Sequence, residues 1–89
     1  MLDQLRTDLQ SVAQGIVEQA QVERGSRWIK ALEVEHPAVY RLLMAFLDKE
    51  PKDVMASLCA MWPDLKELRR NKHVLKYIGL LQQELRGNK

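Results

Sequence analysis

The chain is poor in the residue types that build catalytic and metal sites. Its 89 residues include one cysteine and two histidines, and they contain no glycine-rich phosphate loop and no pair of side chains at metal-ligand spacing. The single Cys59 can form no internal disulfide and cannot hold a structural zinc alone. It lies between Leu58 and Met61 on an apolar segment, where cysteine is most often an inert core residue. These shortages predict a protein that is not an enzyme and has no metal, no cofactor and no small-molecule substrate. A nucleophilic pair of Cys59 and His73 stays open as an alternative, although nothing in their spacing supports it.

Long hydrophobic runs are also missing. No segment approaches the length needed to cross a bilayer, and Asp3, Arg6 and Asp8 interrupt the apolar spacing of the first residues, which predicts no signal peptide. The composition, 46% hydrophobic and 29% charged, is ordinary for a soluble globular domain. A chain of 89 residues suffices for one domain with one modest core. We therefore expect a cytoplasmic protein with a single domain over residues 1–89 and no membrane partner.

Prolines divide the chain into pieces of helical length. Pro37, Pro51 and Pro63 each suit the first turn of a helix and disfavour helical geometry in the residue before them. Between these breaks the apolar residues recur with the 3.6-residue period of amphipathic helices. The pattern predicts an all-α fold, an irregular compact bundle of five to six short helices. The apolar faces expected for the middle helices are Trp28, Ile29 and Leu32, then Val39, Leu42, Leu43, Phe46 and Leu47, then Val54, Met55, Leu58, Met61 and Trp62.

The first helix is predicted to be amphipathic and to span residues 2–24. Its apolar stripe consists of Leu2, Leu5, Leu9, Val12, Ile16 and Ala20. Gly25 can take the left-handed conformation that ends a helix, and Ser26 can cap the next one, so the remaining helical core is expected over residues 27–89. Gly15, inside the first helix, marks either a close helix crossing or a tolerated weak point.

The last third of the chain is expected to contain an elbow near residues 70–72. At about 100° per residue, Leu65 and Leu68 lie on a different side of a continuous helix from the later apolar stripe of Val74, Ile78, Leu81 and Leu85. A single straight helix would need two buried sides. The pattern therefore predicts a break, with Asn71 capping the last helix.

Charge is unevenly distributed along the chain. Residues 1–23 carry one base and four acids, whereas residues 63–89 carry seven bases and three acids, within a net charge of only +2. If Asn71 caps the last helix, Lys72 and His73 lie in its first turn, where positive charge opposes the helix dipole unless an anion is bound. The sequence thus predicts a site for an anion or an acidic partner, with a solvated helix face as the alternative. The residues of this predicted site are Lys66, Arg69, Arg70, Lys72, His73 and Lys76.

These features favour a non-catalytic protein-interaction module, a small helical adaptor, inhibitor or assembly factor that binds a larger protein as a homodimer. Trp28, beside Arg27, is expected either to form a lid over the core or to be partly exposed as a binding residue. The amphipathic first helix is expected to pack within the bundle, with oligomerisation as the second interpretation. The possible interface residues are Trp28, Arg27, Leu2, Leu5 and Leu9. The alternative is an accessory nucleic-acid-binding protein that uses residues 66–76. We rank it second because this segment is short and lacks interleaved aromatic residues.

Overall fold

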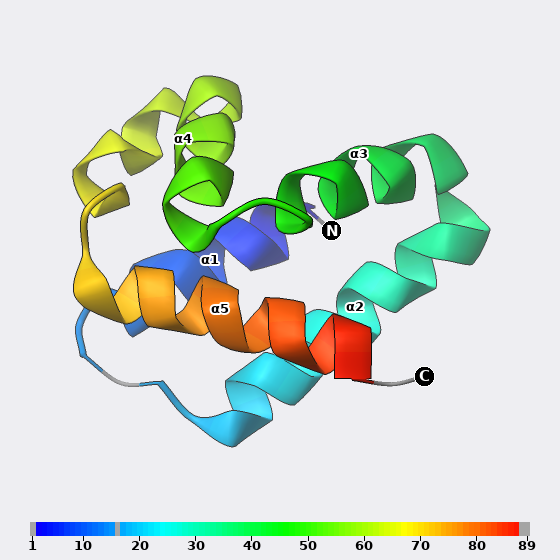
Figure 1. Ribbon diagram of the computed structural model, residues 1–89, viewed down its shortest axis with the longest axis horizontal. Helices are drawn as coiled ribbons and strands as arrows, with labels where there is room; N and C mark the ends of the chain where they lie inside the picture. The colour runs from blue at the N-terminus through cyan, green and yellow to red at the C-terminus, as the bar shows by residue number, and fades with distance from the viewer. Residues whose placement is uncertain (1, 16, 88–89) are drawn as a thin grey trace.

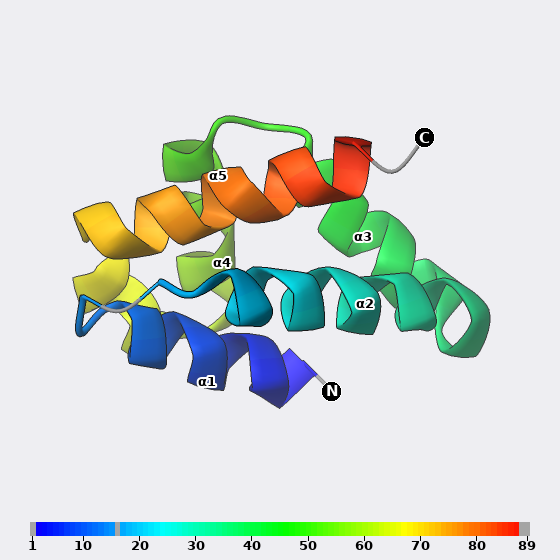
Figure 2. The same ribbon diagram turned by 90° about the horizontal axis from the view of Figure 1, so that it is seen from below.

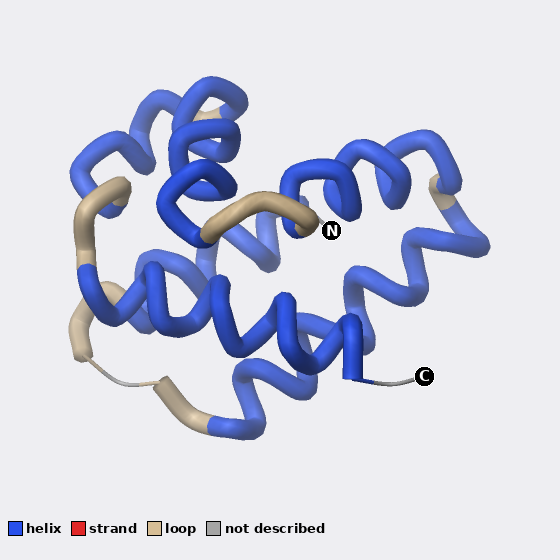
Figure 3. Tube along the Cα trace, viewed as in Figure 1, coloured by secondary structure: helices blue, strands red, loops and turns tan. Residues whose placement is uncertain are grey.

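Helices make up nearly all of the described chain. The computed structural model describes residues 2–15 and 17–87, without the side chains of residues 2 and 3. Within these ranges every regular element is a helix, as Figure 3 shows. The elements are α1 (Leu2–Val12), α2 (Gln19–Glu35), α3 (Pro37–Leu47), α4 (Pro51–Met61), the 3-10 helix η1 (Pro63–Leu68) and α5 (Lys72–Gly87). The all-α bundle of short helices is confirmed.

The three prolines begin helices, as their positions predicted. Pro37, Pro51 and Pro63 are the first residues of α3, α4 and η1. The residue before Pro37, His36, has φ −143° and ψ 74°, which lies outside the helical region. Because a proline ring crowds the preceding backbone, α2 ends there and α3 leaves in a new direction. The result is the α2–α3 hairpin of Figure 1.

Helix α5 organises the bundle. It packs against α1, α2 and α4, and it crosses the middle of the molecule in Figure 1. Seen from below in Figure 2, α1, α2 and α5 lie in successive layers, with α4 and η1 behind them. The Cα radius of gyration is 11.9 Å, close to the value of about 12 Å expected for a compact chain of this length.

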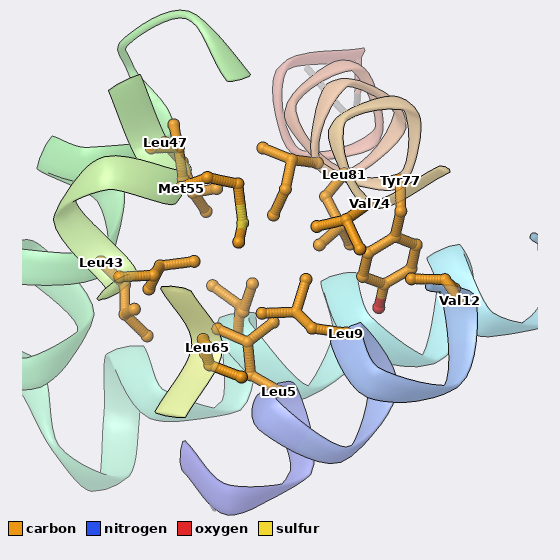
Figure 4. Close-up of a cluster of buried hydrophobic side chains, with 14 of the residues drawn as sticks. Leu5, Leu9, Val12, Leu43, Leu47, Met55, Leu65, Val74, Tyr77 and Leu81 are labelled. Carbon is orange, nitrogen blue, oxygen red and sulfur yellow. The ribbon is translucent and has the colours of Figure 1, made fainter. Parts of the chain in front are cut away.

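Every helix contributes side chains to one hydrophobic core. Figure 4 shows Leu5, Leu9 and Val12 of α1 facing Val74, Tyr77 and Leu81 of α5. Tyr77 is fully buried, and its hydroxyl donates a hydrogen bond to the backbone oxygen of Gln21 at 3.4 Å. The other buried apolar residues are Val22, Ile29, Leu32, Leu43, Leu47, Val54, Met55, Leu58, Leu65 and Ile78.

The first helix is much shorter than predicted. A helix over residues 2–24 is wrong, because α1 ends at Val12 and α2 begins at Gln19. Gly15 lies in the connection with φ +103°, a backbone conformation that other residues rarely adopt. The backbone N–H of Glu18 donates to Gln21 Oε1 at 2.8 Å, which stabilises the new start. Residue 16, part of the predicted stripe, lies outside the described residues.

The predicted break at Gly25 and Ser26 is also wrong. Both residues are buried inside α2. A Cβ on Gly25 would lie 2.8 Å from Tyr77 Oη and 2.9 Å from Leu81 Cδ2, so glycine is what allows α5 to approach α2 this closely. Ser26 Oγ donates back to the Glu23 backbone oxygen at 3.2 Å instead of capping a new helix. Gly25 therefore provides a helix crossing, and Gly15 provides the break.

Two residues of the apolar faces predicted for the middle helices face solvent. Leu42 is 48% exposed and Met61 is 37% exposed. Helix α3 packs against α2 and α4, and its two buried residues are Leu43 and Leu47. The apolar outer side of α3 is an outcome of tertiary packing that helical period alone did not reveal.

Candidate partner-binding surface

The predicted elbow is present, and Asn71 fixes its geometry. After η1, residues 69–70 form a turn, and α5 begins at Lys72. Asn71 Oδ1 accepts hydrogen bonds from the backbone N–H groups of His73 at 2.9 Å and Val74 at 3.2 Å, which is the arrangement of a helix cap. Its Nδ2 also donates to the backbone oxygen of Ala13 at 3.2 Å. One side chain thus caps α5 and ties the elbow to the α1–α2 connection.

The cations around this turn are open to solvent. We call Lys66, Arg69, Arg70, Lys72, His73 and Lys76 the basic elbow. His73 is half-buried, and the other five are exposed. Within residues 2–15 and 17–87, no side chain of the basic elbow takes part in an ion pair or a side-chain hydrogen bond. These cations are therefore not neutralised by an ion pair with any described residue.

The structure brings only part of the basic elbow together. Arg69 and Arg70 line an open cleft of about 440 Å³ together with Lys52, Asp53 and Leu75. Lys52 and Asp53 come from the first turn of α4, which packs against α5. Sequence reasoning missed Lys52, because its proximity to the arginines depends on α4–α5 packing and leaves no local signal.

The remaining basic residues point elsewhere. His73 lies against the α1–α2 connection, since a Cβ on Gly15 would be 3.6 Å from His73 Nε2. Residues 73 and 75 are about 200° apart around a helix, so His73 and the cleft residue Leu75 occupy opposite flanks of α5. Lys72 and Lys76, one turn apart and exposed, lie on the outer face between them. The basic elbow thus wraps around the start of α5.

Local electrostatics leave the start of α5 short of negative charge. Its first turn contains no acidic side chain. Positive side chains at a helix N-terminus oppose the helix dipole, at a cost of about 0.3–1 kcal/mol for an exposed group. Because Asn71 already accepts from the N–H groups of His73 and Val74, an approaching anion would meet mainly the side chains of the basic elbow.

The prediction that the first helix contributes interface residues is wrong for Leu5 and Leu9. Leu5 is 5% exposed and Leu9 is fully buried, because the shortened α1 packs its apolar side against α5, α2 and η1. Neither is available to another molecule in this fold. The side chain of Leu2 lies outside the described residues. On α2, Arg27 is exposed and Trp28 is half-buried against the core.

Cys59 has the environment of a structural thiol. Its Sγ donates to the backbone oxygen of Leu65 at 3.4 Å, whereas His73 lies against Gly15, so the two do not form a pair. Burial raises the pKa of the Cys59 thiol, and the Arg69 guanidinium opposes this shift only in part. The thiol therefore stays protonated and weakly nucleophilic near neutral pH.

A partly buried polar cluster lies between α1, α2 and α5. Asp8 is buried, accepts a hydrogen bond from Gln4 Nε2 at 3.3 Å and lies 3.6 Å from the Arg24 guanidinium. Burial, reinforced by the negative charge of Asp8, raises the pKa of Tyr77 far above its usual value. The cluster joins α1, α2 and α5 through paired groups, which is typical of a structural role.

Among residues 2–15 and 17–87, no group of three or more histidine, cysteine or acidic side chains could hold a metal ion. None of the helices described there has the length and apolar character needed to cross a bilayer. In comparisons with protein-family models, curated proteins and solved structures, nothing matches this chain.

Proposed function

We propose that this protein is a non-catalytic interaction module that binds an acidic surface of a larger protein through the basic elbow. The observation that carries the proposal is a set of cations, mostly exposed and free of ion pairs with the described residues, around a turn that Asn71 holds in place. A fixed turn loses little conformational entropy on binding, and arginine pairs with carboxylates through two parallel hydrogen bonds in a bidentate geometry.

Two observations favour a protein partner over nucleic acid. The basic elbow surrounds the start of α5 on three sides, whereas a nucleic-acid site follows the phosphate backbone along one continuous groove. The net charge of the chain is also only +2, well short of the strongly basic balance typical of nucleic-acid binders. Nucleic acid is therefore the second candidate, and salt dependence separates the two.

The test is a triple charge reversal of Arg69, Arg70 and Lys72 to Glu. A matched control reverses Lys30, Arg41 and Lys49, which are exposed cations outside the basic elbow and the possible interface. We expect proteins captured from the source cell by the wild type and by the control to be lost with the elbow variant. Both variants should keep the helical circular dichroism spectrum, because exposed charges contribute little to stability. Equal capture by all three proteins would contradict the proposal.

Salt titration of the captured complex tests the partner class. Binding to nucleic acid gives a steep linear fall of log affinity with log salt through counterion release. Binding to an acidic protein surface gives a shallower dependence and no binding to bare duplex or single strands. The homodimer stays a prediction, and light scattering at high micromolar concentration measures it directly.

A further inference from the structure

We infer that the cleft lined by Lys52, Asp53, Arg69, Arg70 and Leu75 is a socket for a short partner segment in which an apolar residue lies between two acidic ones. This inference rests on the proposed function and names the chemistry of its partner. We call these five residues the socket.

The shape and lining of the socket fit such a segment. Its volume of about 440 Å³ lies within the range of roughly 300–1,000 Å³ found for ligand clefts, and it exceeds what one small anion would fill. Leu75 is a half-buried apolar residue against which an apolar side chain can pack. Arg69 and Arg70 lie on the turn, and Lys52 is contributed by α4. The socket thus combines cations from two elements with one apolar residue, which complements a segment that combines acidic residues with an apolar one.

The cations of the socket are available for binding. Arg69 and Arg70 make no ion pair with any described residue. Lys52 has one partner, Glu50, at 3.8 Å, and both side chains are more than 70% exposed. Such an exposed pair is worth about 0–1 kcal/mol, so it does not hold Lys52 away from a bound carboxylate.

The backbone of α4 disfavours phosphate in the same place. The backbone donors of its first turn are largely used. Pro51 has no N–H, and the N–H groups of Asp53 and Val54 both donate to the Glu50 backbone oxygen at 2.9 Å. A phosphate cradle needs several free backbone donors, and α4 does not supply them.

The test uses the whole protein labelled with ¹⁵N and titrated with three probes. They are the blocked tripeptide Glu-Leu-Glu, its uncharged counterpart Gln-Leu-Gln, and inorganic phosphate. We expect Glu-Leu-Glu to shift the backbone amide signals of Lys52, Asp53, Arg69, Arg70 and Leu75 in a saturable way. Gln-Leu-Gln and phosphate should bind at least tenfold more weakly. Equal binding of phosphate, or of Gln-Leu-Gln, would overturn the inference.

Lys52→Glu is the decisive variant, because Lys52 belongs to the socket and lies outside the basic elbow. It should weaken Glu-Leu-Glu binding at least tenfold, whereas Lys30→Glu on α2 should leave it unchanged. Arg69→Lys keeps the charge but cannot make the bidentate pair with a carboxylate, so it should weaken Glu-Leu-Glu binding several-fold. Circular dichroism confirms that each variant is folded.

The socket and the proposed function can fail separately. If triple reversal of the basic elbow abolishes partner capture while Lys52→Glu retains it and Glu-Leu-Glu shifts no socket signal, the inference is wrong and the proposed function stands. If Glu-Leu-Glu binds as expected but triple reversal leaves partner capture unchanged, the cleft recognises this peptide chemistry but the captured partner does not use it, and the proposed function is contradicted.

Discussion

Gly25→Ala tests the most specific packing contact in the fold, the crossing of α2 and α5. A Cβ at this position would lie 2.8 Å from Tyr77 Oη and 2.9 Å from Leu81 Cδ2. Both side chains are fully buried, and the tyrosine hydroxyl is held by the Gln21 backbone oxygen. Neither can move aside without disturbing the core, so the substitution must separate the two helices or distort a rotamer.

A second helical glycine supplies the matched control. In the interior of a helix, alanine is favoured over glycine by about 1 kcal/mol. A Cβ on Gly79 of α5 meets only Pro51 Cγ at an ordinary 3.8 Å, so Gly79→Ala should stabilise the protein by up to about that amount. The propensity gain cancels between the two variants. Their difference in unfolding free energy is therefore the overpacking cost at Gly25, about 1–3 kcal/mol.

Urea denaturation followed by circular dichroism measures this difference. In a domain of this size, it corresponds to about 4–8 °C of melting temperature for each kcal/mol. Tyr77→Phe removes the nearer of the two clashing atoms, so it should recover at least about 0.5 kcal/mol in the Gly25→Ala background. If Gly25→Ala is as stable as Gly79→Ala, α5 does not approach α2 as closely as described, and the reasoning fails.

Three further predictions concern stability. Asn71→Ala removes the cap of α5 and its bond to the Ala13 backbone oxygen, so unfolding free energy in urea should fall by about 0.5–2 kcal/mol; an unchanged midpoint would contradict the cap. Leu9→Ala should cost about 2–5 kcal/mol because Leu9 is fully buried, whereas Leu42→Ala, at a position 48% exposed, should cost much less; similar costs would show that α1 does not pack as described. The raised pKa of Tyr77 means that folding disfavours its phenolate, so its contribution to stability is complete below the unfolded tyrosine pKa of about 10 and is lost as pH rises above it. An alkaline urea series should therefore show a shallower loss of stability in Tyr77→Phe than in the wild type, and parallel slopes would contradict the burial of this hydroxyl.

The two glycines show where sequence reasoning reached its limit. A helix end was expected at Gly25, and a helix crossing was one of two interpretations of Gly15, but in the structure Gly15 breaks the helix and Gly25 lies at the crossing. Local propensity treats the two positions alike, since glycine weakens any helix and suits any left-handed turn. The choice depends on which glycine faces another helix, and Tyr77 and Leu81 are more than 50 residues away along the chain.

The elbow, in contrast to the two glycines, could be predicted from the sequence. The mismatch between the apolar sides of residues 63–68 and of α5, together with Asn71 at the junction, was enough to predict a break and its cap. Both signals are local, because hydrophobic period and capping chemistry act within one or two turns of a helix.

The sequence by itself therefore determined the all-α class, the three proline-led helix starts and the elbow, because each depends on residues close together in the chain. Only the tertiary structure decided which apolar faces are covered. It buried Leu5 and Leu9, left Leu42 exposed and brought Lys52 beside Arg69 and Arg70. These outcomes depend on how helices distant in sequence pack against one another. Packing is set by the fit of all the side chains together, which no local pattern encodes.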